Sequence, residues 1–264
     1  MKAGIVELGC GVRIAYDEVG SGKPVLLVHG LSENRAAWDE VTPSLARDHR
    51  VIRIDLPSHG ASSDLPHGER LALAESIGEF VRRLELVSPH LIGHSLGGLL
   101  VTLLAAPVRA ASVVNVDQPF FMGPFIALVR ELEPRLRGSD FVAAMNDMTD
   151  RMGGGCVPAR VLDELRGYRA KARQDFVLSL WRPLLTQDEE AVAAMVEPHL
   201  KQIHCPYLAL HGEEPGAAYR EWLTRAVPTA RIEVWDGLGH WLHRAEPERF
   251  ATRVREFLGS ASAH

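Results

Sequence analysis

Cysteine is scarce in this sequence of 264 residues, which contains only three. Cys10, Cys156 and Cys205 form no C-x-x-C pair, and an odd number of widely spaced cysteines argues against a disulfide framework. A reducing compartment suits this cysteine usage best. Because the amino terminus also lacks the long apolar stretch of a secretory signal, we expect a cytoplasmic protein.

Long apolar segments and an excess of basic charge are missing as well. No apolar run is long enough to cross a bilayer, so we expect no membrane span. The net charge is -5, and lysine and arginine form no basic stripe, which argues against nucleic acid as a partner.

Signals for metal or nucleotide binding are equally weak. The pair His240-x-x-His243 lacks the neighbouring glutamate and the helix of a zinc motif. The glycines at 153–155 do not follow a strand in the G-x-G-x-x-G form that binds dinucleotides. We therefore expect a protein without metal or cofactor whose partner is a small molecule.

Strand and helix signals alternate along much of the chain. Apolar runs predict strands at 12–19, 24–29, 51–55, 111–116, 205–211 and 231–235, and a further short strand that begins at His90. Helical spacing predicts helices at 71–86 and 246–258. This alternation is typical of the α/β class, with a mostly parallel central sheet flanked by helices.

The strand signals stop between residues 120 and 200, where the pattern is helical. We interpret 120–200 as a helical cap inserted into a core formed by 1–119 and 201–264. Most aromatic and methionine side chains of this insertion are expected in the core of the cap, and a few in an apolar substrate pocket. The alternating charges of 160–174 predict a solvated helix face.

Ser95 lies in the most informative segment, where a short apolar strand is followed by Gly-x-Ser-x-Gly and an apolar helix. A serine on such a turn has a strained backbone and an exposed hydroxyl, so it can act as a nucleophile. Gly93 and Gly97 leave room for the helix to cross close to the strand. The N–H of Leu96 then points to where an oxyanion would form.

A serine nucleophile needs a general base that lies far along the chain and folds next to it. His240 is the best candidate, because it lies in a glycine-rich loop after the last predicted strand and before the last helix. The alternative is that His240 is an ordinary loop residue, one of twelve histidines.

Four segments together resemble the α/β-hydrolase superfamily. Residues 27–31 resemble its His-Gly segment, 93–98 its nucleophile turn and 239–240 its histidine loop. Residues 55–62 resemble its Asp-x-x-Gly-x-Gly-x-Ser turn, with Ser58 where the first glycine is usual. The resemblance implies an α/β-hydrolase fold with a helical cap, and an oxyanion hole formed by the N–H groups of Leu31 and Leu96.

The acidic partner of the histidine departs from the family pattern. The family usually has a Gly-x-x-Asp turn after the next-to-last strand, but residues 210–216 contain no aspartate. Glu214 could take its place, unless it is a solvated loop residue. Asp117 is the other candidate, since Asn115 and Gln118 could hold a buried carboxylate at that strand end. Asp117 is slightly favoured, although non-catalytic aspartates also end this strand in the family.

Ser95 and His240 predict a serine hydrolase that works through an acyl-enzyme. The resemblance to the family implies a carboxylic ester or lactone as substrate, and the expected cap implies that this substrate is small and largely apolar. Trp38, Trp181 and Trp241 are expected as walls of the substrate pocket. The alternatives are a thioester, amide or carbon–carbon bond hydrolase with the same triad, and a non-catalytic small-ligand receptor on the same scaffold. The natural substrate, the pathway and the oligomeric state stay open.

Overall fold

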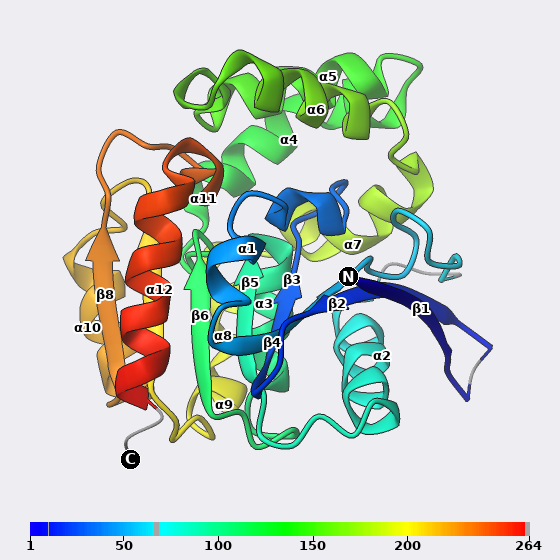
Figure 1. Cartoon of the computed structure of the whole chain (residues 1–264). Helices are drawn as coiled ribbons and strands as arrows, with labels where there is room; N and C mark the ends of the chain where they lie inside the picture. Colours follow the sequence, from blue (N-terminus) through cyan, green and yellow to red (C-terminus); the bar gives the residue numbers. More distant parts are fainter. Residues whose placement is uncertain (10, 66–68, 262–264) are drawn as a thin grey trace.

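A computed structural model of the chain describes residues 1–9, 11–65 and 69–261, so that Cys10 lies outside the described residues. Eight strands of this part of the chain form one sheet, in the order β1-β2-β4-β3-β5-β6-β7-β8 (Figure 1). The strands are β1 Lys2–Glu7, β2 Arg13–Val19, β3 Lys23–Val28, β4 His49–Ile54, β5 His90–His94, β6 Ser112–Val116, β7 Tyr207–His211 and β8 Ala230–Val234.

The sheet is mostly parallel, as the sequence predicts. β2 runs antiparallel to both β1 and β4, whereas the neighbouring pairs from β4 to β8 are all parallel. The strands β5, β6 and β7 are buried along their whole length. Continuous burial follows from helices that cover both faces, which is why apolar residues occupy the middle positions of these strands.

Two apolar layers lie on the two faces of the sheet. On one face, α2 (Arg70–Arg83), α3 (Leu96–Leu104) and α10 (Ala217–Ala226) contribute to the larger core cluster. On the other face, α1 (Thr42–Leu45), α11 (Leu242–Ala245) and α12 (Pro247–Ala261) contribute to a second cluster. The α12 side chains Phe250, Val254 and Phe257 recur at helical spacing and are buried there.

Between β6 and β7 the described chain is helical. The helices are α4 Gly123–Arg137, α5 Phe141–Arg151, η2 Gly154–Cys156, α6 Ala159–Arg169, α7 Gln174–Thr186, α8 Glu189–Ala194 and α9 Glu197–Leu200. Figure 1 shows α4, α5 and α6 above the carboxyl ends of the central strands. Parallel α/β sheets bind ligands at this end. The division into core and cap at 119 and 200 stays a prediction.

The sequence pattern did not predict some of the observed elements. Strand β1 pairs with β2 along its whole length, but it is an edge strand with mostly exposed residues, so it lacks the signal of a buried strand. The short elements η1 (Arg35–Trp38), α1 and α11 are also additional, since one helical turn carries too little periodicity to detect. Among the described residues, no helix is long and apolar enough to cross a membrane.

Candidate active site

Ser95 lies on the sharp turn between β5 and α3, as the sequence predicts. Its backbone has φ 51° and ψ -120°, a region that residues other than glycine rarely occupy. The Ser95 N–H donates to the carbonyl of Val116 at 2.9 Å, which ties the turn to the end of β6. The strained conformation is therefore held in place by the sheet.

Glycines on both sides of Ser95 allow strand and helix to approach closely. A Cβ atom on Gly93 would lie 2.1 Å from the carbonyl oxygen of Gly97. A Cβ atom on Gly97 would lie 2.2 Å from the carbonyl oxygen of Val28, at the end of β3. No side chain fits at such distances, so the turn requires glycine at both positions.

The structure brings His240 and Asp117 together. His240 lies in the loop between β8 and α11, and Asp117 follows β6. The Nδ1 atom of His240 donates to Oδ2 of Asp117 at 2.6 Å, and the N–H of Gly212 donates to Oδ1 at 2.9 Å. The carboxylate is thus fixed by a backbone group on one side and holds the histidine ring with the other.

Burial and hydrogen bonding act on the pKa values of this pair in opposite directions. Burial alone would raise the pKa of Asp117, but the nearby His211, 3.7 Å away, and the hydrogen bond from His240 lower it well below its ordinary value. For His240, burial lowers the pKa, and the contact with Asp117 only partly offsets that effect. His240 is therefore neutral at neutral pH, the form that a general base needs.

Glu214, the other acid considered, has different partners. Its carboxylate accepts hydrogen bonds from Arg220 at 2.8 and 2.6 Å, and its side chain is about half exposed, at 53%. Glu214 lines the outer part of the site, but Asp117 is the acid that accepts the hydrogen bond from His240 Nδ1.

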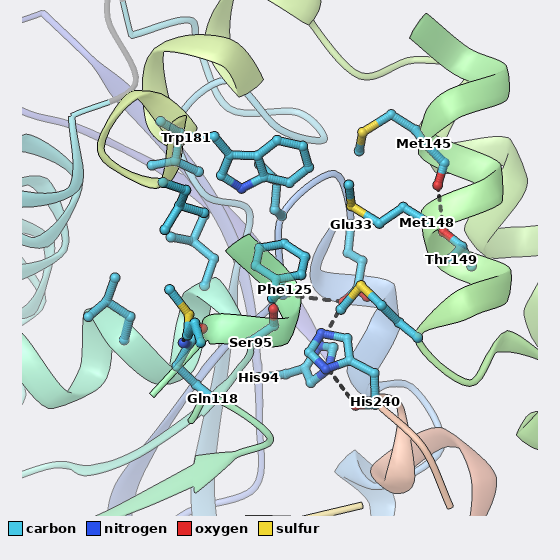
Figure 2. A pocket seen from close by; sticks show the side chains of 18 of the residues that line it. Glu33, His94, Ser95, Gln118, Phe125, Met145, Met148, Thr149, Trp181 and His240 are labelled. Carbon is cyan, nitrogen blue, oxygen red and sulfur yellow. Dashed lines mark hydrogen bonds and ion pairs between the residues drawn. The ribbon is translucent and has the colours of Figure 1, made fainter. Parts of the chain in front are cut away.

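Ser95 lies where two cavities meet. The inner pocket has a volume of about 80 Å³ and the outer cleft about 590 Å³. The inner pocket is lined by Gly30, Leu31, Glu33, Arg70, His94, Ser95, Leu96, Leu99, Gln118, Met122, Phe125, Met145, Met148, Thr149, Met152, Arg169, Leu180, Trp181, Leu184 and His240. The outer cleft is lined by Ser95, Asp117, Gln118, Pro119, Phe121, Met122, Pro124, Phe125, Leu128, Arg151, Met152, Glu189, His211, Glu213, Glu214, Pro215 and His240. Figure 2 shows the inner pocket, where side chains from several helices and loops converge.

The expected oxyanion donors both belong to the inner pocket. Leu31 and Leu96 line it beside Ser95. Within the described residues, neither backbone N–H has a hydrogen-bond acceptor, so both are available to a ligand. The carbonyl of Leu31 accepts a hydrogen bond from Arg169 at 2.8 Å, which fixes this loop to α6.

Ser95 and His240 line both cavities, but among the described contacts there is no hydrogen bond between Ser95 Oγ and the His240 ring. In enzymes without substrate this contact is often long and shortens when substrate binds. In the described part of the chain, no three histidine, cysteine or acidic side chains are grouped to hold a metal ion.

Glu33 and His94 are part of the site although the sequence pattern did not single them out. Glu33 is buried, and it accepts a hydrogen bond from Trp241 Nε1 at 2.7 Å and one from the N–H of Gly30 at 3.2 Å. His94 Nδ1 lies 3.4 Å from Glu33, while His94 Nε2 donates to the carbonyl of His240 at 2.9 Å. Burial would raise the pKa of Glu33, but His94 and more distant cations lower it overall.

Two of the three tryptophans expected in the pocket wall lie elsewhere. Trp181 does line the inner pocket and contacts Phe125 edge to face. Trp38 is fully buried in the second core cluster against Phe250, because η1 turns it toward α12. Trp241 is also buried, in a small cluster with Val161 and Leu165 of α6, and its indole donates a hydrogen bond to Glu33. For Trp38 and Trp241 the expectation was wrong, because closeness in sequence to a site loop does not set the direction of a side chain.

The predicted solvated face at 160–174 needs a correction at one position. Arg169, at the end of α6, is only 7% exposed and lines the inner pocket. Neighbouring Arg166 is exposed and bound to Asp150, as the prediction requires. Charge alternation identifies a polar helix, but it does not reveal that the last turn reaches over the active-site loop.

Comparison with known proteins agrees with this geometry. The family model described as "Alpha/beta hydrolase family" matches residues 25–253. The chain belongs to the α/β-hydrolase family. It is therefore a hydrolase enzyme with the fold that the sequence motifs predict, and relatives named as esterases support ester hydrolysis in general.

Several relatives span nearly the whole chain. Esterase YbfF of Escherichia coli (strain K12) is 26% identical over 250 residues, which is 90% of this chain and 94% of that protein. The pimeloyl-[acyl-carrier protein] methyl ester esterase of Nitrosomonas europaea is 28% identical over 257 residues, 90% of this chain and 97% of the relative. The solved enol-lactonase of Burkholderia xenovorans LB400 shares the fold, with a TM-score of 0.79, 20% identity and coverage of 97% and 100%.

Proposed function

We propose that this protein hydrolyses a small carboxylic ester or lactone, with Ser95 as nucleophile, His240 as general base and Asp117 as the acid that orients His240. The observation that carries the proposal is the 2.6 Å hydrogen bond between His240 and Asp117 next to the strained turn of Ser95. A fixed carboxylate selects the ring tautomer whose other nitrogen can accept a proton.

The first half of the reaction forms an acyl-enzyme. Ser95 Oγ attacks the carbonyl carbon while its proton passes to Nε2 of His240. The N–H groups of Leu31 and Leu96 donate to the oxygen that becomes negative. The intermediate then collapses, and the alcohol leaves with the proton from His240.

The second half restores the enzyme. A water molecule gives a proton to His240 and attacks the acyl carbon, which yields a second intermediate in the same oxyanion site. Collapse of this intermediate releases the carboxylic acid and returns the proton to Ser95 Oγ. A lactone follows the same steps, except that the alcohol and the acid stay in one product.

Labelling with a fluorophosphonate probe tests the nucleophile. We expect rapid modification that peptide mass spectrometry maps to Ser95, with no labelling of Ser95→Ala. Hydrolysis of 4-nitrophenyl butanoate should fall to background in both Ser95→Ala and His240→Ala, because triad members act as a unit. A folded wild-type protein that resists the probe and cleaves no ester or lactone would instead indicate a receptor, and thioester or amide turnover without ester turnover would indicate another hydrolase chemistry.

A further inference from the structure

Two arginines line the inner pocket beside Ser95. Arg70 lies at the start of α2 in the core, and Arg169 lies at the end of α6 in the insertion. Among the described residues, neither guanidinium lies within ion-pair distance of a carboxylate, whereas the buried Arg53 and Arg244 each contact acidic side chains. Arg169 is buried and Arg70 is half-buried. Burying a guanidinium without an anion is costly, so Arg169 above all is a candidate ligand-binding residue.

The hydrogen bonds of these arginines leave donors free. Arg169 donates from Nη1 to the carbonyl of Leu31 at 2.8 Å and from Nε to Thr149 at 3.3 Å. Arg70 makes one long contact, from Nη2 to the carbonyl of Leu180 at 3.4 Å. Within the described residues the remaining N–H groups have no acceptor, yet they are not among the sealed, unpartnered polar atoms. They therefore keep some accessible surface, to which a ligand in the pocket can bind.

The carboxylate of Glu33 does not neutralise both arginines. Its oxygens already accept hydrogen bonds from Trp241 and Gly30, and His94 lies beside them. Counting the lining residues Glu33, Arg70 and Arg169 leaves one positive charge in excess. Support of the Leu31 loop explains one contact of Arg169. It does not explain why Arg70, at the start of α2, also lines the pocket.

We propose that the substrate carries a carboxylate, which Arg169 and Arg70 bind in the inner pocket while the scissile ester or lactone lies at Ser95. This inference rests on the proposed hydrolase function and names its substrate class. The excess of a single positive charge and the small volume of about 80 Å³ suit a planar, singly charged anion. A guanidinium matches such a carboxylate with two parallel N–H groups.

The rest of the lining fits the carbon chain of such a substrate. Met145, Met148, Phe125 and Trp181 provide apolar surface around the same space, as Figure 2 shows. The proposed substrate is therefore largely apolar, as the sequence predicts, but carries one charged end. The larger outer cleft, which Ser95 also lines, takes the uncharged half of the molecule.

Paired substrates of equal length test the proposal. The 4-nitrophenyl monoester of glutaric acid and 4-nitrophenyl pentanoate have the same chain and differ in the terminal carboxylate. We expect kcat/KM of the wild type to favour the charged ester by about 10- to 100-fold, the range of a charged hydrogen bond. A second pair, 4-(butanoyloxy)benzoate and its methyl ester, puts the carboxylate on the leaving half and shows which half carries it.

Variants then connect the preference to the arginines. Arg70→Gln and Arg169→Gln should each remove most of the preference, measured as the ratio of kcat/KM for the charged and the neutral ester within the same variant. Arg166→Gln is the matched control, because Arg166 lies on the same helix, is exposed and contacts Asp150. Should Arg169→Gln fail to fold, Arg169→Lys keeps the charge and Arg70→Gln still decides.

Binding to Ser95→Ala gives a readout that does not depend on turnover. Calorimetry should detect binding of monomethyl glutarate. The affinity for methyl pentanoate should be markedly lower. Equal or better use of the neutral partner in both pairs, or a preference that survives both arginine variants, would overturn the inference and leave the hydrolase function intact. Absence of all ester turnover together with selective binding of monomethyl glutarate would instead contradict the proposed function and support the anion site.

Discussion

The Nδ1 atom of His240 donates a 2.6 Å hydrogen bond to Oδ2 of Asp117, although 123 positions separate them in the chain. Asp117 also has a positive φ of 51°, and Oδ1 accepts from the N–H of Gly212. The carboxylate is thus held by the ends of two neighbouring parallel strands, β6 and β7. A carboxylate on such a rigid support positions a histidine better than one on an exposed loop does.

Asp117→Asn should lower kcat strongly while leaving KM for a simple ester nearly unchanged. The amide keeps the shape but no longer selects the required tautomer or stabilises the imidazolium; in a chymotrypsin-type protease the same change costs about 10⁴ in turnover. Glu214→Gln is the control, since Glu214 contacts Arg220, and its activity should stay within about twofold of the wild type. A crippled Glu214→Gln beside a normal Asp117→Asn would reverse the assignment.

The pH profile of kcat/KM should rise along a limb whose midpoint lies below 6.5 and reach a plateau by neutral pH. Burial lowers the pKa of His240, so the ring loses its proton at a lower pH than an exposed histidine does. Because the neutral ring is the base, activity appears as pH increases through this pKa. In Asp117→Asn the residual activity should show a still lower midpoint, because the interaction that raises the pKa is gone. A midpoint above 7 in the wild type would contradict this account.

Trp241→Phe should destabilise the protein more than Trp38→Phe. Trp241 Nε1 donates to the buried Glu33, so its loss leaves a carboxylate oxygen without that donor, at a cost of about 1–3 kcal/mol. Trp38 Nε1 is buried and has no acceptor in the described residues, and the same change there loses no hydrogen bond. Urea unfolding of both variants measures the difference. Equal destabilisation would show that the indole contact with Glu33 contributes nothing.

Gly97→Ala should destabilise the fold and lower activity, whereas Gly167→Ala should stabilise it slightly. At Gly97 the new methyl group would meet backbone oxygens at 2.2 and 2.7 Å, so strand and helix must move apart at a cost of about 1–3 kcal/mol. At Gly167, inside α6, nothing lies within 4 Å, and alanine improves the helix by about 0.5–1 kcal/mol. Thermal unfolding and ester turnover of both variants provide the check. Unchanged stability and turnover in Gly97→Ala would show that the turn can accommodate a methyl group at this position.

Local pattern was sufficient for the sheet and for the turn at Ser95. A buried strand, a sharp turn and a helix leave their marks within a few neighbouring residues, as apolar runs and as glycines at Gly93 and Gly97. The strands predicted from the sequence correspond to β2 through β8, and the edge strand β1 escaped because little of it is buried. The α/β class and the position of the serine were thus determined by the sequence alone.

The tertiary structure decided what depends on the direction of side chains from distant segments. The sequence left Asp117 and Glu214 open, and only the folded chain brings Asp117 to His240. It also turns Trp38 into the core and places Arg169 over the loop of Leu31. Periodicity records which face of an element is buried, but it carries no information about the group that face meets. That information arises only when segments separated by a hundred or more residues pack together.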